Sequence, residues 1–126
     1  MKILIADDDP DDLGLFKSAL MEIAPHSTLL TAGDGVQLMQ LLHSAEKPGL
    51  VVLDLNMPLK SGKECLYEIK QDPAYAKVPV VILTTSKRQA DVEECLLKGV
   101  ARYYVKPYSF NELKFIIKEI TEEIIN

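Results

Sequence analysis

Five short apolar segments, rich in β-branched residues, alternate along the chain with segments of helical periodicity. The apolar segments are residues 2–6, 28–32, 50–53, 78–83 and 103–105. Apolar residues recur every three or four positions over residues 13–23, 36–42, 65–69, 92–97 and 113–124. This pattern repeats a strand–helix unit five times. It therefore predicts an α/β fold with a parallel sheet, helices on both of its faces and right-handed crossovers.

The expected helix ends carry capping signals. Asp9 followed by Pro10 predicts an N-cap and a first helical residue. Gly99 suits the end of the helix over 92–97, where a positive φ is often needed. A serine followed three residues later by Glu or Gln predicts three capping boxes, namely Ser61 with Glu64, Ser86 with Gln89 and Ser109 with Glu112.

Length and charge restrict the class of protein. A chain of 126 residues is long enough for one domain with a core. The net charge of −5 argues against nonspecific nucleic-acid binding, which needs a basic face. No apolar run approaches the ~20 residues of a membrane span, and the first apolar stretch is too short for a signal peptide. We therefore expect no nucleic-acid or membrane partner.

The cysteines show no metal-binding pattern. Cys65 and Cys95 lack ligand spacing with each other and with His26 and His43. We interpret both as small buried apolar residues in a protein of the reducing cytoplasm.

Polar residues follow four of the expected strands. The apolar run VVL, which is typical of a buried strand, is followed directly by Asp54, although unpaired acidic residues usually lie on the solvent-exposed surface. Asp7 and Asp8 follow the first strand, Thr84 the fourth and Lys106 the fifth. Ligands of open α/β sheets bind at the carboxyl ends of the strands. The sequence therefore predicts one site that contains all five side chains.

Acids gathered in this way need a cation. Two carboxylates about 4 Å apart repel by roughly 4 kcal/mol at an effective dielectric near 20, so a bare cluster would capture a proton. Oxygen ligands favour Mg²⁺ or Mn²⁺ over zinc, and Mg²⁺ readily takes phosphate oxygens. The acids therefore point to metal-dependent phosphoryl chemistry.

The remaining groups suit phosphoryl transfer. A phosphoryl group in transfer carries charge on three oxygens, which a metal, the Lys106 ammonium and the Thr84 hydroxyl can share. Asp54, on the central strand, is the expected nucleophile and would form an aspartyl phosphate.

Ordinary structural roles are open for the same residues. Asp9, Asp11 and Asp12 fit a solvated acidic turn that caps the first helix. Thr84 fits the start of a loop, and Lys106 fits a surface charge, as most lysines are. Their coincidence at one edge of the sheet favours the functional interpretation.

Over its whole length the chain resembles the receiver domain of two-component response regulators. The matching motifs are ADDDP after the first strand, DLNMP with Gly62, LTTS at 83–86 and YVKP at 104–107. The resemblance implies a flavodoxin-like, doubly wound sheet with strand order 2-1-3-4-5. The DDDPDD start and the TTS triplet are similar to stand-alone receivers, which include chemotaxis-protein-like and phytochrome-associated ones.

The resemblance implies a role for each matching residue. Asp54 corresponds to the phospho-accepting aspartate. Asp8 corresponds to a direct Mg²⁺ ligand and Asp7 to one that acts mainly through water, and Asn56 would add its main-chain carbonyl. Lys106 corresponds to the lysine beside the phosphoryl group, and its bond to Pro107 is expected to be cis.

The resemblance also implies a switch. Thr84 would move inward to contact the phosphoryl group, and Tyr103 would fill the vacated space. The change would bias a surface made of the fourth helix, fifth strand and fifth helix. The alternative for Tyr103 is simple packing against the fourth helix.

The function implied is that of a stand-alone switch rather than an enzyme with an external substrate. A histidine kinase or phosphotransfer protein would phosphorylate it, and it would catalyse only its own phosphorylation and dephosphorylation. We expect one receiver domain over residues 1–126, no output domain, and a downstream protein target. Phe115, opposite the apolar stripe of its helix, is a candidate anchor for a partner or for a homodimer through the switch surface, or else a lone exposed apolar residue.

Two other classes of function compete with this interpretation. One is a haloacid-dehalogenase-type phosphatase with an aspartyl nucleophile. That class has a second acid two residues after the nucleophile, where this chain has Asn56, and a cap insertion that this sequence lacks. The other is a structural module with a silent site, which the complete set of acids, hydroxyl and lysine disfavours.

Overall fold

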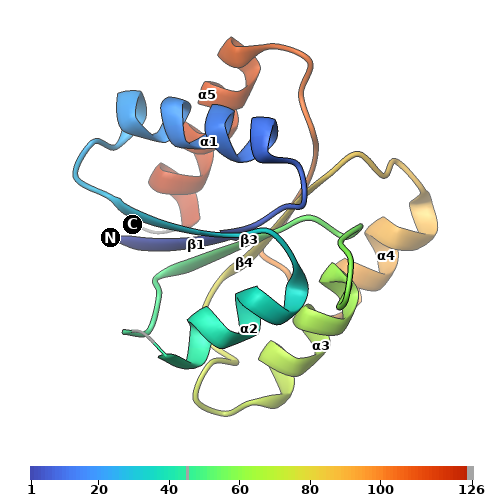
Figure 1. Cartoon of the computed structure of the whole chain (residues 1–126). Coiled ribbons are helices and arrows are strands. Elements are labelled where there is room, and N and C mark those ends of the chain that lie inside the picture. The colour runs from blue at the N-terminus through green and yellow to red at the C-terminus, as the bar shows by residue number, and fades with distance from the viewer. Residues whose placement is uncertain (45, 125–126) are drawn as a thin grey trace.

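The computed structural model describes residues 1–44 and 46–124, which form a parallel sheet between two layers of helices (Figure 1). The strands are β1 (Lys2–Ala6), β2 (Thr28–Ala32), β3 (Leu50–Leu53), β4 (Val80–Thr84) and β5 (Arg102–Val105). The helices are α1 (Pro10–Ile23), α2 (Gly35–Ser44), α3 (Gly62–Gln71), α4 (Gln89–Leu97) and α5 (Phe110–Glu119), which a π-helical turn, η1 (Ile120–Ile124), continues.

The sheet has the predicted topology. Its five strands are all parallel, in the order β2-β1-β3-β4-β5. Helices α1 and α5 cover one face, and α2, α3 and α4 cover the other (Figure 1). The flavodoxin-like fold class is therefore confirmed. Strand β4 begins at Val80 rather than at 78, because Pro79 has no N–H group to donate to the ladder.

Alternating side chains of the central strands supply two cores. On β3, Val51 and Leu53 face the layer that contains Leu38 of α2 and Leu66 of α3. Leu50 and Val52 face the opposite layer, with Phe16 of α1 and Ile117 of α5. Because both faces of β3 and β4 are covered, every residue of these two strands is buried.

Most of the predicted helix starts are confirmed. The Asp9 side chain accepts a hydrogen bond from the backbone N–H of Asp11, with Pro10 as the first helical residue. Ser61 and Glu64 form a complete capping box. Ser109 accepts a hydrogen bond from the backbone N–H of Glu112, which is one of the two hydrogen bonds of the predicted capping box.

The capping box predicted at Ser86 is wrong. Arg88 is the N-cap of α4 and makes no side-chain cap hydrogen bond. The Ser86 hydroxyl instead donates to the carboxylate of Asp91, and the backbone N–H of Arg88 donates to Ser86 Oγ. A hydrogen bond to a charged carboxylate is stronger than one between neutral groups, which explains the preference.

Both cysteines are buried free thiols, as predicted. Burial raises the pKa of the Cys65 thiol to about 12, so this group stays protonated at neutral pH. None of the helices in the described part of the chain is long and apolar enough to cross a membrane.

Two glycines meet specific backbone demands. Gly99, directly after α4, has φ +90°, as its sequence position predicts. A Cβ on Gly62 would lie 2.2 Å from the carbonyl oxygen of Asp54, and the backbone N–H of Gly62 donates to the carbonyl of Leu55. The start of α3 is thus packed directly against the backbone that carries Asp54.

We predict that Gly62→Ala destabilises the protein by about 2 kcal/mol or more, because the added methyl group overlaps backbone atoms that cannot move aside. Gly14→Ala is the matched control. No atom lies within 4 Å of its added Cβ, and alanine at this exposed position of α1 should stabilise the protein by about 0.5–1 kcal/mol. Urea unfolding measures both effects, and a Gly62→Ala variant as stable as the parent would contradict this packing.

Candidate functional site

Asp54 follows β3 directly and contacts side chains from the ends of β4 and β5. Its side chain is buried, at 5% exposure. One carboxylate oxygen accepts a hydrogen bond of 2.7 Å from Thr84 Oγ1 and one of 3.3 Å from the backbone N–H of Asn56. The other lies 3.1 Å from Lys106 Nζ. The central place of β3 therefore explains how this acid is tolerated at a buried strand end.

Asp7 and Asp8 bring two more carboxylates from the end of β1. Asp7 is buried, and its Oδ1 accepts a hydrogen bond of 3.0 Å from the backbone N–H of Asp9. Asp8 is exposed. One oxygen from each of Asp7, Asp8 and Asp54 lies within 4.8 Å of the others. This all-oxygen set, open to solvent on the Asp8 side, fits a hard divalent cation that keeps some of its water ligands.

Asn56, the fourth predicted metal residue, lies two positions after Asp54 and is exposed. Its backbone N–H contacts the Asp54 carboxylate. Asn56 is thus at the site, and the contact of its carbonyl with a metal stays a prediction.

Lys106 is surrounded by carboxylates. Its Nζ lies 2.8 Å from Asp7 Oδ2, 2.8 Å from Asp12 Oδ2 and 3.1 Å from Asp54 Oδ2. Burial by itself lowers the pKa of this ammonium, but the hydrogen bonds to Asp12, Asp7 and Asp54 together raise the pKa above its ordinary value. Lys106 is therefore a fixed positive charge at the site.

The sequence comparison agrees with this geometry. Residues 3–118 match the response regulator receiver domain. The chain belongs to the receiver-domain family of response regulators. It is 30% identical to a chemotaxis protein CheY homolog of Campylobacter jejuni, over 95% of this chain and 92% of that protein. It is 33% identical to the response regulator Rcp1 of Synechocystis, over 94% of this chain and 84% of that protein.

Solved structures of receivers have the same fold. The phosphorylated cyanobacterial phytochrome response regulator RcpA superimposes with a TM-score of 0.89 at 35% identity, over 96% of this chain and 91% of that one. The Mn²⁺-bound form of Rcp1 gives a TM-score of 0.89 at 31% identity, over 99% of this chain and 94% of that one. The predicted likeness to stand-alone and phytochrome-associated receivers is therefore confirmed.

Thr84 and Tyr103 of this receiver lie on adjacent strands. Thr84, fully buried, is held by its hydrogen bond to Asp54. Tyr103 is half-buried, and its hydroxyl donates to the carbonyl of Ser86, 2.9 Å away, in the loop that follows β4. Tyr103 also packs against the core beneath α2, α3 and α4. The alternative role predicted for this residue, packing against the fourth helix, therefore agrees with its contacts.

Two expectations about the receiver site need correction. The first is the Lys106–Pro107 bond, which is trans rather than cis, like every peptide bond in the described residues. The physical reason is that X–Pro bonds favour the trans isomer by about 0.5–1 kcal/mol.

The second is the interpretation of Asp9, Asp11 and Asp12 as a solvated turn, which holds for Asp9 and Asp11 because both are exposed. It is wrong for Asp12, whose carboxylate pairs with Lys106 because the first turn of α1 lies beside the end of β5.

A second polar network was not predicted. Lys63 of α3 contacts Asp91 of α4 at 2.6 Å and Glu94 at 3.4 Å. Asp91 also accepts the hydrogen bond from Ser86, whose carbonyl binds Tyr103. The network joins α3 to the loop between β4 and α4. Sequence spacing could not reveal it, because Lys63 and Asp91 are 28 residues apart.

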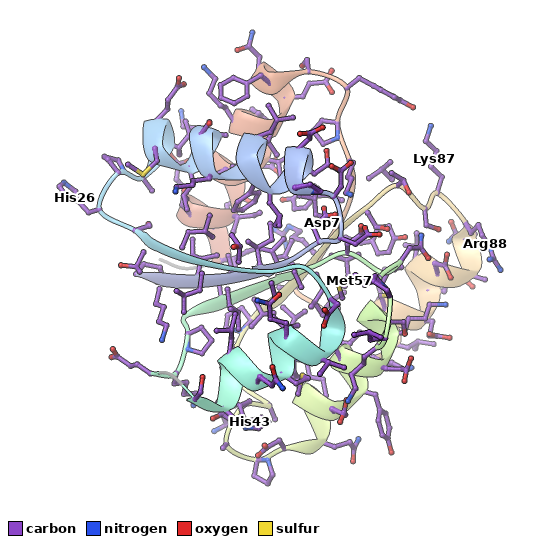
Figure 2. The ribbon with its side chains drawn as sticks, viewed as in Figure 1. Asp7, His26, His43, Met57, Lys87 and Arg88 are labelled. Atoms are coloured by element: carbon purple, nitrogen blue, oxygen red, sulfur yellow. The ribbon has the colours of Figure 1, made fainter. Side chains whose placement is uncertain are left out.

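The histidines lie away from the acids. Asp7 and Met57 are at the edge of the sheet where α1 and α3 begin, whereas His26 and His43 project elsewhere (Figure 2). His43 contacts the ring of Tyr75 with a centroid distance of 5.1 Å. The groups gathered around Asp54 are the carboxylates of Asp7 and Asp8, the Thr84 hydroxyl, the Lys106 ammonium and the backbone N–H of Asn56.

Burial of the Asp7 carboxylate, beside the charge of Asp54, should destabilise the metal-free protein. Burial raises the pKa of Asp7 from 3.8 to about 6, and the Asp54 charge adds to the increase, while Lys106 and the Asp9 N–H oppose it. A raised carboxyl pKa means that the folded state prefers the neutral acid. The free energy of unfolding should therefore fall as pH rises from about 4 through about 6.

We predict that Asp7→Asn raises the free energy of unfolding in EDTA at pH 7 by about 1–2 kcal/mol. The gain should vanish near pH 4, where Asp7 of the parent protein is already neutral. Asp11→Asn, at an exposed acid of the same segment, should have little effect. A metal-free Asp7→Asn protein less stable than the parent at pH 7 would contradict the proposed cost of burying the Asp7 charge.

Proposed function

We propose that this receiver is a phosphorylation-dependent switch in which Asp54 accepts a phosphoryl group from a histidine kinase or a phosphotransfer protein. The observation that carries the proposal is the set of contacts on Asp54. The Thr84 hydroxyl and the Lys106 ammonium, from the ends of two other strands, both hydrogen-bond to its carboxylate.

The chain's own residues support such a transfer. An Asp54 oxygen would attack phosphorus, forming an O–P bond while the bond between phosphorus and the donor breaks and its electron pair leaves with the donor. Lys106 and Thr84 already contact Asp54, so both can bind the oxygens of the transferred group with little movement.

A divalent cation fits beside these groups. Asp7, Asp8 and Asp54, with the main-chain carbonyl of Asn56, would hold Mg²⁺, or alternatively Mn²⁺. The bound ion would neutralise charge on the phosphoryl oxygens. Support comes from the close approach of the three acids and from the Mn²⁺-bound form of Rcp1.

Phosphorylation would act on the surface through Thr84. A phosphoryl group would add charge and acceptor oxygens to the carboxylate that Thr84 now contacts. Movement of Thr84 toward these oxygens would alter the space beside Tyr103 and the hydrogen bond between Tyr103 and Ser86. The loop between β4 and α4 is thus the proposed route to the outer surface.

The proposed output surface is formed by α4, β5 and α5. It carries exposed apolar side chains, namely Leu96, Leu97, Val105, Tyr108 and Phe115. Phe115 is 64% exposed, as its position opposite the apolar stripe predicts. Exposed apolar groups on neighbouring elements suit a downstream protein target or a second copy of the chain.

The competing functions find less support. A haloacid-dehalogenase-type phosphatase would have an acid where Asn56 stands, and Asn56 cannot serve as a general acid. A silent module gives no reason to gather a lysine, a threonine and several acids around one buried carboxylate. We therefore propose that the chain catalyses only its own phosphorylation and dephosphorylation.

Incubation with Mg²⁺ and acetyl phosphate tests the proposal. We predict one labile phosphoryl adduct by intact mass spectrometry. It should be absent in Asp54→Asn and in EDTA, because both the nucleophile and the cation are needed. Asp34→Asn is the control and should form the adduct normally, because Asp34 follows β2 and lies outside the cluster of Asp7, Asp8 and Asp54. Release of phosphate from external esters, or the absence of any adduct, would contradict the proposed function.

Self-association tests the output surface. We predict that Phe115→Ser weakens dimer formation in Mg²⁺ and beryllofluoride by about tenfold, because it removes a large exposed anchor. Sedimentation velocity measures the effect. The control is Tyr67→Ser, which removes a 55% exposed aromatic ring from α3, outside this surface. Equal effects of both substitutions, or a parent protein that stays monomeric, would contradict a homodimer through Phe115.

A further inference from the structure

Lys106 has one acidic partner outside the acids that fit a metal. Asp12 Oδ2 lies 2.8 Å from Lys106 Nζ, as close as Asp7 and closer than Asp54. Asp12 belongs to the first turn of α1, and its side chain is 36% exposed. The oxygens of Asp7, Asp8 and Asp54 cluster within 4.8 Å of one another, and Asp12 is not a member of that cluster.

The other two partners of Lys106 have competing demands. Asp7 and Asp54 contribute carboxylate oxygens to the cluster that fits a divalent cation, and both carboxylates also contact the Lys106 ammonium. A cation bound there would attract the same two carboxylates that Lys106 now contacts, and its charge would repel the ammonium. Asp12 is the carboxylate that can keep its contact with Lys106 under those conditions.

We propose that Asp12 is a positioning residue for Lys106. Its carboxylate holds the ammonium beside the site while Asp7 and Asp54 turn to the metal, and it releases Lys106 to the phosphoryl group after transfer. This inference rests on the proposed function, because it requires both a bound cation and a phosphorylated Asp54.

The charges favour such an exchange. Asp7, Asp8, Asp12 and Asp54 outnumber the single ammonium, so added divalent charge still leaves Asp12 a net attraction for Lys106. Phosphorylation then replaces the single charge of Asp54 with about −2 and adds strong acceptor oxygens. Lys106, already 3.1 Å from Asp54, needs only a small movement to exchange one partner for the other.

The rival explanation is that Asp12 only stabilises the start of α1. An acid in the first turn interacts favourably with the helix dipole whatever its contacts. Asp11 separates the two explanations, because it lies in the same turn and is exposed. Within residues 1–44 and 46–124, its carboxylate is in neither a hydrogen bond nor an ion pair. Asp11→Asn thus makes the same charge change without removing a contact to Lys106.

Isothermal titration with Mg²⁺ tests the role of Asp12. We expect Asp12→Asn to weaken Mg²⁺ binding by about fivefold, because the released Lys106 competes harder for Asp7 and Asp54. Asp11→Asn should change the affinity by less than about twofold, since it leaves the ion pair intact. Asp12→Glu, which keeps the charge, should restore most of the parent affinity.

A double-mutant cycle shows whether Asp12 acts through Lys106. In a Lys106→Met background, Asp12→Asn should change Mg²⁺ affinity by less than about twofold, because no ammonium is left to position. Thermal unfolding in EDTA verifies that the variants are folded. If Asp12→Asn does not fold, Asp12→Ser takes its place in the same experiments.

Two results would overturn the role of Asp12. One is equal weakening by Asp12→Asn and Asp11→Asn, and the other is an unchanged effect of Asp12→Asn in the Lys106→Met background. A parent protein that binds no Mg²⁺ and forms no acetyl-phosphate adduct would overturn the proposed function itself. A parent that does both, with an Asp12→Asn variant that binds Mg²⁺ normally, would overturn only the role of Asp12.

Discussion

The Lys106 ammonium balances the carboxylates that the fold brings to one edge of the sheet. Asp7, Asp12 and Asp54 come from two separate regions of the chain, and each lies within 3.1 Å of this single cation. Without it, only neutral hydrogen-bond donors, namely the Thr84 hydroxyl and the backbone N–H groups of Asn56 and Asp9, would offset the repulsion between the buried charges of Asp7 and Asp54. The same acids remain in excess over Lys106, which is why the site is suited to an additional cation.

The scaffold holds these charges by close backbone packing. Strand β3 is buried on both faces and ends at Asp54, and Gly62 lets α3 start directly against the backbone of that residue. The loop after β4 carries Ser86, which contacts both Tyr103 and Asp91. A change at Asp54 therefore has a short physical path through Thr84 to the loop before α4. The cluster at the acids and the network around Asp91 are two parts of one edge of the sheet.

The fold and most of the site could be predicted because both follow from local sequence pattern. Apolar strands alternating with helical periodicity specify a parallel sheet, and strand ends then identify Asp7, Asp8, Asp54, Thr84 and Lys106. The ion pair of Asp12 could not be predicted, because it depends on how the start of α1 lies against β5. The capping box predicted at Ser86 is wrong for a local reason, because the Asp91 carboxylate five residues later accepts the hydrogen bond of the Ser86 hydroxyl. Contacts between elements distant in the sequence carry no periodic signal.

The location of a bound metal tests most directly whether these charges form one site. Crystals grown with Mn²⁺ and measured at its absorption edge would give a peak at the ion in an anomalous difference map. The account predicts one strong peak between the carboxylates of Asp8 and Asp54 and the main-chain carbonyl of Asn56, with Lys106 still beside Asp12. A peak elsewhere on the surface, or none at this edge of the sheet, would contradict it.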